Sequence, residues 1–496
     1  MVFLKSLYLC GRKGDIAMLL NELINGTNAT DILGDIDSVE IGGLCYNSLK
    51  VKKGDVFVAV KGFNSDGHKY IKSAVENGAV AVVVEDVADD INVPQIVFED
   101  TRAALATLAT KYYGNPSGKF RLIGVTGTNG KTTVTYLVKT ILESKGYKVG
   151  LIGTNQNMVG NMILKSDRTT PESLELQELF SIMVRDGVDY VVMEVSSHSL
   201  ELNRVLGCNF EVGAFTNLTQ DHLDFHLTMD NYVKAKSKLF SMCEKGVVNI
   251  DDAYTEKLTD GALSNIEYYG VKSDCKHKAE NITYGEKGVD FDTDGVRVTL
   301  PIPGEFSVYN ALCAIGICHA LGIDTESCAQ ALKCAHGVKG RAEVVQIPSD
   351  YTVMIDYAHT PDGVENIINA VKGFCKGRII TLFGCGGDRD RTKRPIMGEI
   401  AGKLSDFCVV TSDNPRTENP ASIIEDIMVG VNKTDVEYEV VENRKKAIEY
   451  AMSIAGKGDV VLLLGKGHET YQILNDGIID FDEREIVAEI FDKLTK

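Results

Sequence analysis

The chain has 496 residues, with 52 Lys and Arg against 70 Asp and Glu, so its formal net charge is −18 at pH 7. This length predicts about three domains of roughly 150 residues each. A hydrophobic fraction of 44% and a charged fraction of 25% are ordinary for a globular protein and exclude wholesale disorder. Because a strongly negative chain repels polyphosphate at long range, we do not expect a non-specific nucleic-acid binder. An anionic small molecule stays a candidate ligand only where local cations override this charge.

The sequence predicts a cytoplasmic protein without membrane insertion. No apolar run approaches the ~20 residues that a membrane-spanning helix needs. The N-terminal segment carries Lys5 inside a short apolar stretch and lacks a small-residue cleavage site, which argues against a signal peptide. The 12 cysteines contain no CxxC pair, so neither a zinc ribbon nor a thioredoxin-like redox site finds support, and we expect reduced thiols.

Strands and helices are predicted to alternate along the whole chain, which indicates the α/β fold class with a central P-loop domain and mainly parallel sheets. The near-continuous Val and Ile runs of the central part favour a sheet covered on both faces. The last third predicts a second, Rossmann-like sheet, and the resulting boundaries give domains at 1–98, 99–336 and 337–496. The expected strands are 55–60, 79–85, 121–127, 149–153, 189–196, 212–218, 246–251, 352–358, 378–387, 407–413 and 459–467, and the expected helices 68–77, 101–113, 132–146 and 306–323.

The strongest motif is Gly-Thr-Asn-Gly-Lys-Thr-Thr at 127–133, between a predicted strand and a predicted helix. Glycines let backbone N–H groups turn onto phosphate, and a helix N-terminus adds partial positive charge. Lys131 is expected to reach the β- and γ-phosphates of ATP, and Thr132 to bind Mg²⁺. The GxxxxGK[ST] pattern itself fails, because Val125 stands at its first glycine. The alternative is a glycine turn with an incidental Lys-Thr pair, and we favour the ATP site.

Three further positions carry candidate metal chemistry. Glu194 ends an apolar strand, where a carboxylate binds Mg²⁺ or is simply a strand-end acid. The stretch around His222 is rich in His and Asp but lacks a third soft ligand for zinc, and a lone histidine is usually structural. Lys236 lies in an apolar-flanked stretch, where it is either a plain counterion or a carbamylated lysine that binds metal. The residues alone leave these alternatives open.

Ten motifs follow one another along the chain: GTNGKTT, EVSSHS, TNLTQDHLDFH, AKSKLF, GEFSVYN, GVKGRAE, IDYAHTPD, GGDRDRTKRP, SDNPR and GKGHETYQ. Together they resemble the Mur ligase family over roughly residues 38–490. The resemblance is to the members that add the third residue of the peptidoglycan peptide. It implies a UDP-binding domain, an ATPase and an amino-acid-binding domain, and a reaction that passes through an acyl phosphate. The implied small-molecule partners are ATP, the cofactor Mg²⁺ and UDP-MurNAc-L-Ala-D-Glu, with the protein a monomer.

The resemblance also assigns residue roles. Catalytic residues are Lys131, Glu194, His222 and Lys236, the last as an N6-carboxylated lysine, and the metal ligands are Thr132, Glu194, His222 and Lys236. ATP contacts are Gly127, Thr128, Asn129, Gly130, Lys131, Thr132, Thr133, Asn217, Asn310, Arg341, Asp356 and His359. Contacts to the UDP-MurNAc dipeptide are Ser48, Thr169, Thr170, Ser196 and Arg204.

The DNPR motif resembles that of ligases that add meso-diaminopimelate, so the resemblance implies this amino acid as the one added. Its pocket would comprise Arg389, Asp413, Asn414, Arg416, Gly465 and Glu469, which follow apolar strands and so meet at one sheet edge. Arg416 suits a distal carboxylate and Glu469 an ammonium. Three alternatives stay open. Arg416 caps a turn or pairs with Glu418; the enzyme adds L-lysine or another diamino acid; or the chain is an inactive nucleotide-binding scaffold.

The sequence departs from the family pattern early in the UDP-binding domain. Asn47, Ser48 and Leu49 stand where relatives commonly have Asp-Ser-Arg, and Leu202 replaces a position that is often polar. These departures put the nucleotide-sugar contacts in doubt without touching the ATP site. Sister ligases such as folylpolyglutamate synthase are the nearest rival, although they are not expected to combine the DNPR and GKGHE motifs.

Overall fold

The computed structural model describes residues 18–62, 65–166, 168–261, 265–285 and 288–494. The predicted absence of a signal peptide concerns a segment outside these residues. The chain forms two compact units: residues 1–124, 147–211 and 241–244 make unit 1, and residues 125–146, 212–240 and 245–496 make unit 2. Strand β8 (Arg121–Thr126) is divided between them.

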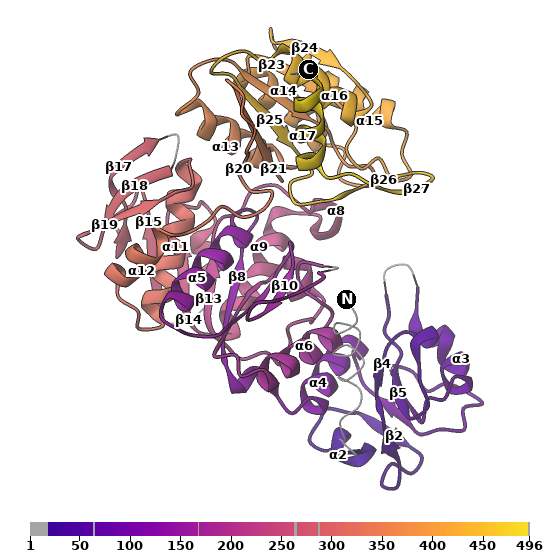
Figure 1. The fold of residues 1–496 in the computed structure, drawn as a ribbon. Coiled ribbons are helices and arrows are strands. Elements are labelled where there is room, and N and C mark those ends of the chain that lie inside the picture. The colour runs from indigo at the N-terminus through magenta and orange to yellow at the C-terminus, as the bar shows by residue number, and fades with distance from the viewer. Residues whose placement is uncertain (1–17, 63–64, 167, 262–264, 286–287, 495–496) are drawn as a thin grey trace. The chain divides into compact units, whose positions relative to one another are not determined.

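The N-terminal part of unit 1 is a mainly parallel sheet with helices on both faces (Figure 1). Its strand order is β2-β7-β6-β5-β4, in which only β2 pairs antiparallel among the described strands. Helices α2 and α4 bury Leu20 and Leu105 against Val56 on one face, and α3 packs Ile71 against Phe57 on the other. The elements are β1 (Met18–Leu19), α2 (Leu20–Ile24), β2 (Asp31–Leu33), β3 (Glu40–Ile41), β4 (Gly43–Cys45), η1 (Ser48–Lys50), β5 (Asp55–Val58), η2 (Gly67–Tyr70), α3 (Ile71–Glu76), β6 (Ala81–Val84), β7 (Gln95–Val97) and α4 (Thr101–Tyr112).

The rest of unit 1 continues the alternation with strands ordered β11-β10-β9-β12. Strand β12 runs parallel to β9, whereas β10 and β11 form an antiparallel hairpin that the sequence does not predict. The elements are η3 (Pro116–Lys119), β9 (Val149–Ile152), β10 (Asn157–Val159), β11 (Met162–Leu164), α6 (Ser173–Arg185), β12 (Tyr190–Glu194) and α7 (Ser197–Glu201).

The first part of unit 2 contains strands ordered β13-β14-β15-β16 and a separate antiparallel sheet β17-β18-β19. Helix α11 packs on β15 and contacts α5, and its buried face carries Leu312 and Ile315. The elements are α5 (Lys131–Ser144), β13 (Phe210–Phe215), α8 (Leu223–His226), α9 (Met229–Ser237), η4 (Lys238–Ser241), β14 (Cys243–Asn249), α10 (Thr255–Thr259), β15 (Ile266–Gly270), β16 (His277–Lys278), β17 (Glu280–Gly285), β18 (Gly288–Thr293), β19 (Val296–Leu300), α11 (Glu305–Ala320) and α12 (Thr325–Leu332).

The last part of unit 2 is the predicted Rossmann-like sheet, ordered β20-β21-β25-β22-β23-β24. All pairings in this sheet are parallel except that of β20. Helices cover both faces (Figure 1): Met397 and Ile427 are buried in the core on one face, and Ala447 and Val487 in the core on the other. The elements are β20 (Glu343–Val345), β21 (Thr352–Asp356), α13 (Pro361–Lys372), β22 (Ile379–Phe383), α14 (Lys393–Leu404), β23 (Phe407–Val410), α15 (Pro420–Val431), β24 (Glu437–Val440), α16 (Arg444–Ile454), β25 (Val460–Leu464), β26 (Tyr471–Leu474), β27 (Gly477–Asp480) and α17 (Glu483–Leu494).

Candidate active site

The predicted phosphate loop joins β8 to α5, as the sequence indicates, and α5 begins at Lys131. Gly127 has φ +146 and Gly130 has φ +85, values that favour glycine. Space matters as well, because a Cβ on Gly127 would overlap the Thr216 hydroxyl and one on Gly130 the Asn310 side-chain oxygen. Both glycines are therefore required by the close packing of the loop.

The loop N–H groups are held by Asn217 from the segment after β13. The Thr128 N–H donates to the Asn217 carbonyl (2.8 Å), and the Asn129 N–H donates to Asn217 Oδ1 (2.9 Å). Thr132 and Thr133 lie buried in the first turn of α5. Asn217, predicted as an ATP contact, thus lies directly against the loop.

Two predicted catalytic lysines converge on one loop carbonyl. Lys131 Nζ donates to the carbonyls of Gly127 and Thr128 at 2.8 Å each, and Lys236 Nζ donates to the Gly127 carbonyl at 2.8 Å. Lys236 is 1% exposed and its Nζ lies 4.6 Å from the Tyr232 ring centroid. Burial, reinforced by the charge of Lys131, lowers the pKa of Lys236 well below 10.5. This burial favours the neutral amine at Lys236.

His222 lies before α8 with φ +54 and pairs with Asp221, their Nε2 and Oδ2 atoms 3.4 Å apart. Burial alone would raise the pKa of Asp221, but the charges of His222, His359 and Lys393 lower it to about 2. Asp221 is therefore an anion at neutral pH, placed among cationic and imidazole groups. No sequence argument singled it out as a site residue.

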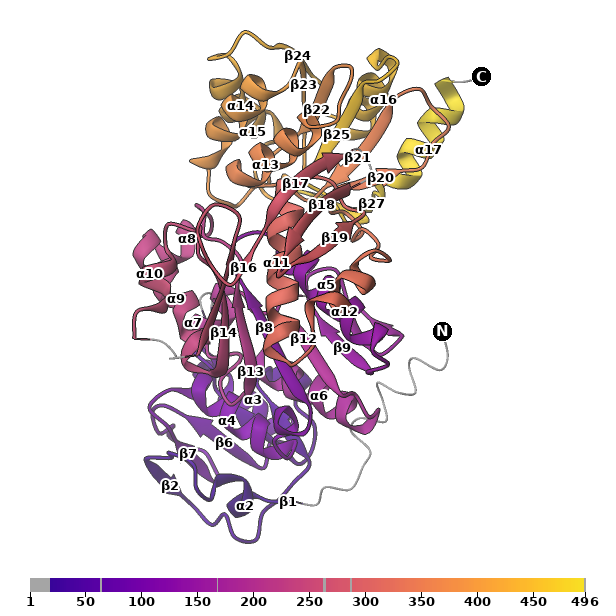
Figure 2. The ribbon, with the colours of Figure 1, turned by 90° about the vertical axis from the view of Figure 1, so that its left-hand side faces the viewer.

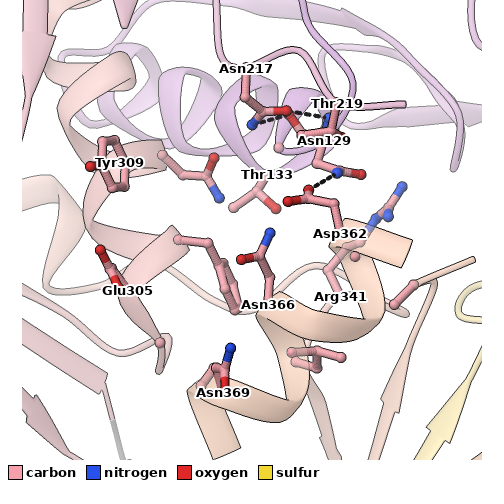
Figure 3. A pocket seen from close by; sticks show the side chains of 18 of the residues that line it. Asn129, Thr133, Asn217, Thr219, Glu305, Tyr309, Arg341, Asp362, Asn366 and Asn369 are labelled. Carbon is pink, nitrogen blue, oxygen red and sulfur yellow. Dashed lines mark hydrogen bonds between the residues drawn. The ribbon is translucent and has the colours of Figure 1, made fainter. Parts of the chain in front are cut away.

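A cavity of about 540 Å³ opens beside the loop (Figure 3). It is lined by predicted ATP-binding residues from distant parts of the sequence: Asn129, Gly130, Thr133, Asn217, Asn310, Arg341 and Asp356. Asn129 Nδ2 donates to Asp362 Oδ2 on α13 (2.6 Å), a bond drawn in Figure 3. The volume of the cavity is within the range of nucleotide and cofactor pockets.

Among the described residues, Arg341 is one of two cationic residues that line this cavity, with Lys272. Its guanidinium carbon lies 4.8 Å from the Tyr357 ring centroid, and its NH2 group donates to Thr132 Oγ1 at 3.3 Å. The Arg341 Nε atom is buried without a hydrogen-bond partner among the described residues. Such an atom costs free energy unless a ligand satisfies it, which fits an anionic or polar occupant. Asp356 accepts the N–H groups of Ala342 and Ala358 at 2.7 and 2.8 Å.

His359 is a neutral imidazole of defined tautomer. Burial, with a contribution from Lys393, lowers its pKa from 6.5 to about 4. Its Nδ1 lies 2.8 Å from the Tyr357 carbonyl, which can only accept, so Nδ1 carries the proton. The Nε2 lone pair is consequently left as an acceptor.

The pKa of His359 predicts a loss of stability in acid. The unfolded chain takes up this proton near pH 6.5 and the folded chain only near 4, so acid favours the unfolded state in this window. We expect the free energy of unfolding to fall below pH 6.5 and His359→Gln to flatten that fall by up to about 1.4 kcal/mol per pH unit. Urea unfolding at several pH values measures how the free energy of unfolding of each protein depends on pH. The exposed His336→Gln variant should keep the slope of the unmodified protein, and an unchanged slope in His359→Gln would contradict the assignment.

In unit 1, Glu194 ends β12 and is 1% exposed. Its two carboxylate oxygens accept the N–H and the hydroxyl of Thr154, both at 2.9 Å, and the Thr154 hydroxyl lies 3.0 Å from that of Thr169. A carboxylate has further lone pairs after these two bonds, so Glu194 can still ligate a metal ion.

The predicted dipeptide contacts assemble next to it. The Thr170 hydroxyl donates to the Glu194 carbonyl (2.8 Å) and accepts the Ser196 N–H (3.1 Å). Arg204 NH1 donates to the Thr170 carbonyl (3.3 Å), and its NH2 pairs with Glu172 at 2.9 Å. The structure thus brings Thr169, Thr170, Ser196 and Arg204 into one polar cluster.

Ser48 begins the short helix η1 of the N-terminal sheet region. It is buried at 8% exposure, and its carbonyl accepts a hydrogen bond from Asn77 Nδ2 (3.0 Å). Leu49, which departs from the family pattern, is 85% exposed, while Asn47 caps the short helix η1 by accepting the Leu49 N–H.

The predicted amino-acid pocket is built at the carboxyl edge of the last sheet. Asn414 Nδ2 donates to Glu469 Oε2 (2.9 Å), and Lys466 Nζ donates to the same carboxylate atom (2.9 Å) and to Asn414 Oδ1 (3.2 Å). Lys466 is fully buried, so it neutralises Glu469 within the cluster. Asp413 is also buried, and a Cβ on Gly465 would come within 2.5 Å of its Oδ2 atom.

Arg416 lies beside this cluster with φ +54, a strained value for a non-glycine residue. Its NH1 group donates to the Gly387 carbonyl (2.7 Å), and Arg389 NH1 donates to the Asp388 carbonyl (3.0 Å). Glu418, the alternative partner for Arg416, forms a two-point ion pair with Arg394 instead, at 2.8 and 3.0 Å. That pairing weakens the alternative interpretation of Arg416.

Family models match three stretches of the chain. They are those for the Mur ligase family catalytic domain (residues 40–113), the Mur ligase middle domain (125–318) and the Mur ligase glutamate ligase domain (340–467). The UDP-N-acetylmuramoyl-L-alanyl-D-glutamate--2,6-diaminopimelate ligase of Caldanaerobacter subterraneus subsp. tengcongensis is 52% identical over 95% of this chain and 99% of its own length. The chain belongs to the Mur ligase family.

Other Mur ligases agree with this assignment. The enzyme of the same name from Clostridium botulinum is 51% identical over 92% of this chain and 96% of its own length. A solved structure described by that name matches with a TM-score of 0.69 at 29% identity, over 97% of this chain and 100% of that one. The α/β class and the arrangement of N-terminal, central and C-terminal domains are therefore confirmed. None of the described helices combines the length and apolarity needed to cross a bilayer.

This Mur ligase contains site residues that the sequence reasoning missed. Thr154 holds Glu194, Asp362 binds the phosphate loop, and Lys466 neutralises Glu469. Thr154 lies two residues after the end of β9, so a systematic look at strand ends would have found it, whereas Asp362 and Lys466 lie inside recognised motifs and their partners appear only in the fold.

Proposed function

We propose that this Mur ligase joins meso-diaminopimelate to the γ-carboxylate of D-Glu in UDP-MurNAc-L-Ala-D-Glu, with ATP converted to ADP and phosphate. The observation that carries the proposal is the 52% identity, over essentially the full length, to a ligase named for 2,6-diaminopimelate. The Asn414–Lys466–Glu469 cluster beside Arg416 supports it, because a mixed-charge pocket suits an amino acid with its own distal ammonium and carboxylate.

The reaction needs two transfers. A γ-carboxylate oxygen attacks the terminal phosphorus of ATP and ADP leaves; then the deprotonated amine attacks the acyl carbon and inorganic phosphate leaves. Lys131, once released from the loop carbonyls, offsets the charge that crowds at the phosphates. Arg341, Asn310 and Asp356 would hold the nucleotide in the cavity, and Arg204 with Thr169, Thr170 and Ser196 the dipeptide.

Magnesium is proposed as the cofactor. One Mg²⁺ would bind the hydroxyl of Thr132 and the carboxylate of Glu194, and a second would bind the imidazole of His222 and a carbamate on Lys236; oxygen donors suit this ion. Bound Mg²⁺ would neutralise phosphate charge and polarise the transferred group. We also propose the domain boundaries 1–98, 99–336 and 337–496, Ser48 as a UDP contact, and a monomeric cytoplasmic enzyme.

Lys236 is proposed to carry a carbamate. A neutral amine is the form that attacks CO₂, and burial favours that form at Lys236. We expect removal of CO₂ and bicarbonate to lower kcat and re-addition to restore it. The Lys236→Arg variant should stay inactive throughout.

Carbon-13 NMR with labelled bicarbonate measures the modification directly. A carbamate signal should appear in the unmodified protein and in the matched control Lys234→Arg, whose lysine is exposed on the same helix α9. A signal that persists in Lys236→Arg would contradict the site. Activity that does not respond to bicarbonate would contradict the role.

The decisive experiment measures ADP release and product mass with ATP, UDP-MurNAc-L-Ala-D-Glu and one amino acid at a time. Meso-diaminopimelate should support turnover with kcat/KM at least about 100-fold above that of L-lysine, because an arginine left without its carboxylate costs several kcal/mol. L-glutamate should also be poor, because it has no distal ammonium for the carboxylate of Glu469. Equal use of L-lysine would overturn the amino-acid assignment. Absence of amino-acid-dependent ADP release would instead support an inactive scaffold.

A further inference from the structure

A cluster of metal-ligating side chains lies in unit 2 outside the residues that line the nucleotide cavity. Glu267 on β15, His277 on β16 and His319 on α11 place one ligand atom each within 4.8 Å of one another. Helix α11 packs against both strands, and Figure 2 shows it beside β16. None of these residues belongs to a motif that the proposed reaction uses.

The distances are close to those of a metal centre. Glu267 Oε2 lies 2.9 Å from His277 Nε2 and 3.0 Å from His319 Nδ1. With Zn–N and Zn–O bonds of about 2.0–2.2 Å in tetrahedral geometry, neighbouring ligand atoms stand roughly 3.3 Å apart. The two separations from Glu267 would need to lengthen by only a few tenths of an ångström for these atoms to surround one ion, and the two histidine nitrogens lie within 4.8 Å of each other.

A second layer of contacts holds the buried imidazole in orientation. His277 is fully buried, its Nδ1 lies 2.8 Å from Asp294 Oδ2, and Thr325 Oγ1 donates to the same Asp294 oxygen (2.8 Å). Metal-bound histidines typically donate their other N–H to a carboxylate in this way. Gly316 on α11 lies beside the ring, where a Cβ would make an ordinary contact with His277 at 3.5 Å and would crowd Val247 at 2.8 Å.

Lys276 is a cation that would compete with a metal ion for Glu267 and His319. Its Nζ lies 2.9 Å from Glu267 Oε1 and 3.4 Å from His319 Nδ1. An ammonium only donates, so this contact needs the lone pair of His319 Nδ1, whereas the 3.0 Å contact of the same atom with Glu267 Oε2 needs a proton there; a neutral His319 makes one contact or the other. The Lys276 side chain is 48% exposed and is free to turn toward solvent.

We propose that Glu267, His277 and His319 bind a divalent transition metal, with Zn²⁺ the best fit and water as the fourth ligand. Two imidazoles and one carboxylate favour zinc over magnesium, which prefers oxygen ligands. The ion would tie β15, β16 and α11 together and, through Asp294, the turn between β18 and β19. It would stabilise the fold by mass action and take no part in the ligase reaction.

Cobalt(II) titration of the metal-free full-length protein tests the site, with excess Mg²⁺ to saturate oxygen-ligand sites. We expect one equivalent to bind with the visible absorption of tetrahedral nitrogen and oxygen ligation. Zn²⁺ should displace it and raise Tm. Absence of stoichiometric binding would overturn the proposal. A thiolate charge-transfer band would also overturn it, because such a band would show that a cysteine binds the ion.

Variants locate the ion. His319→Gln, whose side chain is 37% exposed, should weaken cobalt binding at least tenfold, as should His277→Gln if it folds. Asp294→Asn should weaken it about 10–100-fold, whereas Lys276→Met should tighten it. The matched control His336→Gln, an exposed histidine, should bind as the unmodified protein does. Unchanged affinity in His319→Gln would overturn the assignment, while kcat of the ligase is expected to be the same in His319→Gln and the unmodified protein.

Discussion

Replacing Lys131 by methionine is expected to lower kcat for amino-acid-dependent ADP release by about a thousandfold. Methionine keeps the unbranched side chain and removes only the ammonium, which donates to the carbonyls of Gly127 and Thr128. Loss of one preorganised charge at a transferring phosphoryl group costs about 3–4 kcal/mol. Steady-state kinetics at saturating substrates measures the effect, and the phosphate loop itself should stay folded.

Lys145→Met is the control for this variant, because Lys145 ends the same helix and bonds Ser327 well away from the loop. It should retain kcat within about twofold, since exposed surface substitutions rarely matter. A Lys131→Met enzyme with near-normal kcat and a normal Tm would show that Lys131 has no role in phosphoryl transfer. A fall in Tm would instead indicate damage to the loop, so both quantities are needed.

Replacing Arg416 by alanine is expected to lower kcat/KM for meso-diaminopimelate by about 100- to 1,000-fold while KM for ATP changes little. Removal of one partner of a buried charge pair costs about 2–5 kcal/mol. Arg416→Lys should also be poor, because an ammonium cannot reproduce a two-point contact with a carboxylate. Substrate-competition assays with L-lysine give the change in specificity directly.

Arg391→Ala is a matched control for the loss of one arginine in the same loop region, since Arg391 is exposed and pairs with Asp426. Backbone strain needs separate attention, because Arg416 has φ +54 and alanine tolerates that value no better. Arg416→Asn therefore serves as a second variant, since asparagine adopts this conformation readily. Equal loss of ATP and diaminopimelate use in all three Arg416 variants would contradict a role in amino-acid recognition.

Much of the α/β framework could be predicted from apolar runs and glycine-rich turns. The strand expected at 121–127 is β8, and the helix expected at 132–146 begins one residue earlier, at Lys131. No strand was predicted over 280–300, although β18 alternates half-buried and buried residues with the period of two that marks an antiparallel strand. Its many polar residues concealed that pattern.

The candidate site could be predicted only where its residues share a motif. The phosphate loop and its lysine follow from local order along the chain, because strand, glycine turn and helix are continuous in sequence. The bond between Asn129 and Asp362 joins residues 233 positions apart, and no local pattern encodes it. Similarly, Lys466 was expected to be part of a motif, but only packing reveals that it lies 2.9 Å from Glu469 and neutralises it.

The Asn129–Asp362 bond bears on how the chain can be dissected. The cavity wall takes Asn129, Tyr309 and Asn310 from parts of unit 2 that precede residue 340, and Arg341, Asp356 and Tyr357 from the part that follows it. A fragment that stops before residue 340 would retain the phosphate loop but lose the arginine and the aromatic ring opposite it. Such a truncated protein should bind inorganic polyphosphates and still fail to discriminate among nucleosides, so nucleotide selectivity is a property that no single excised module possesses.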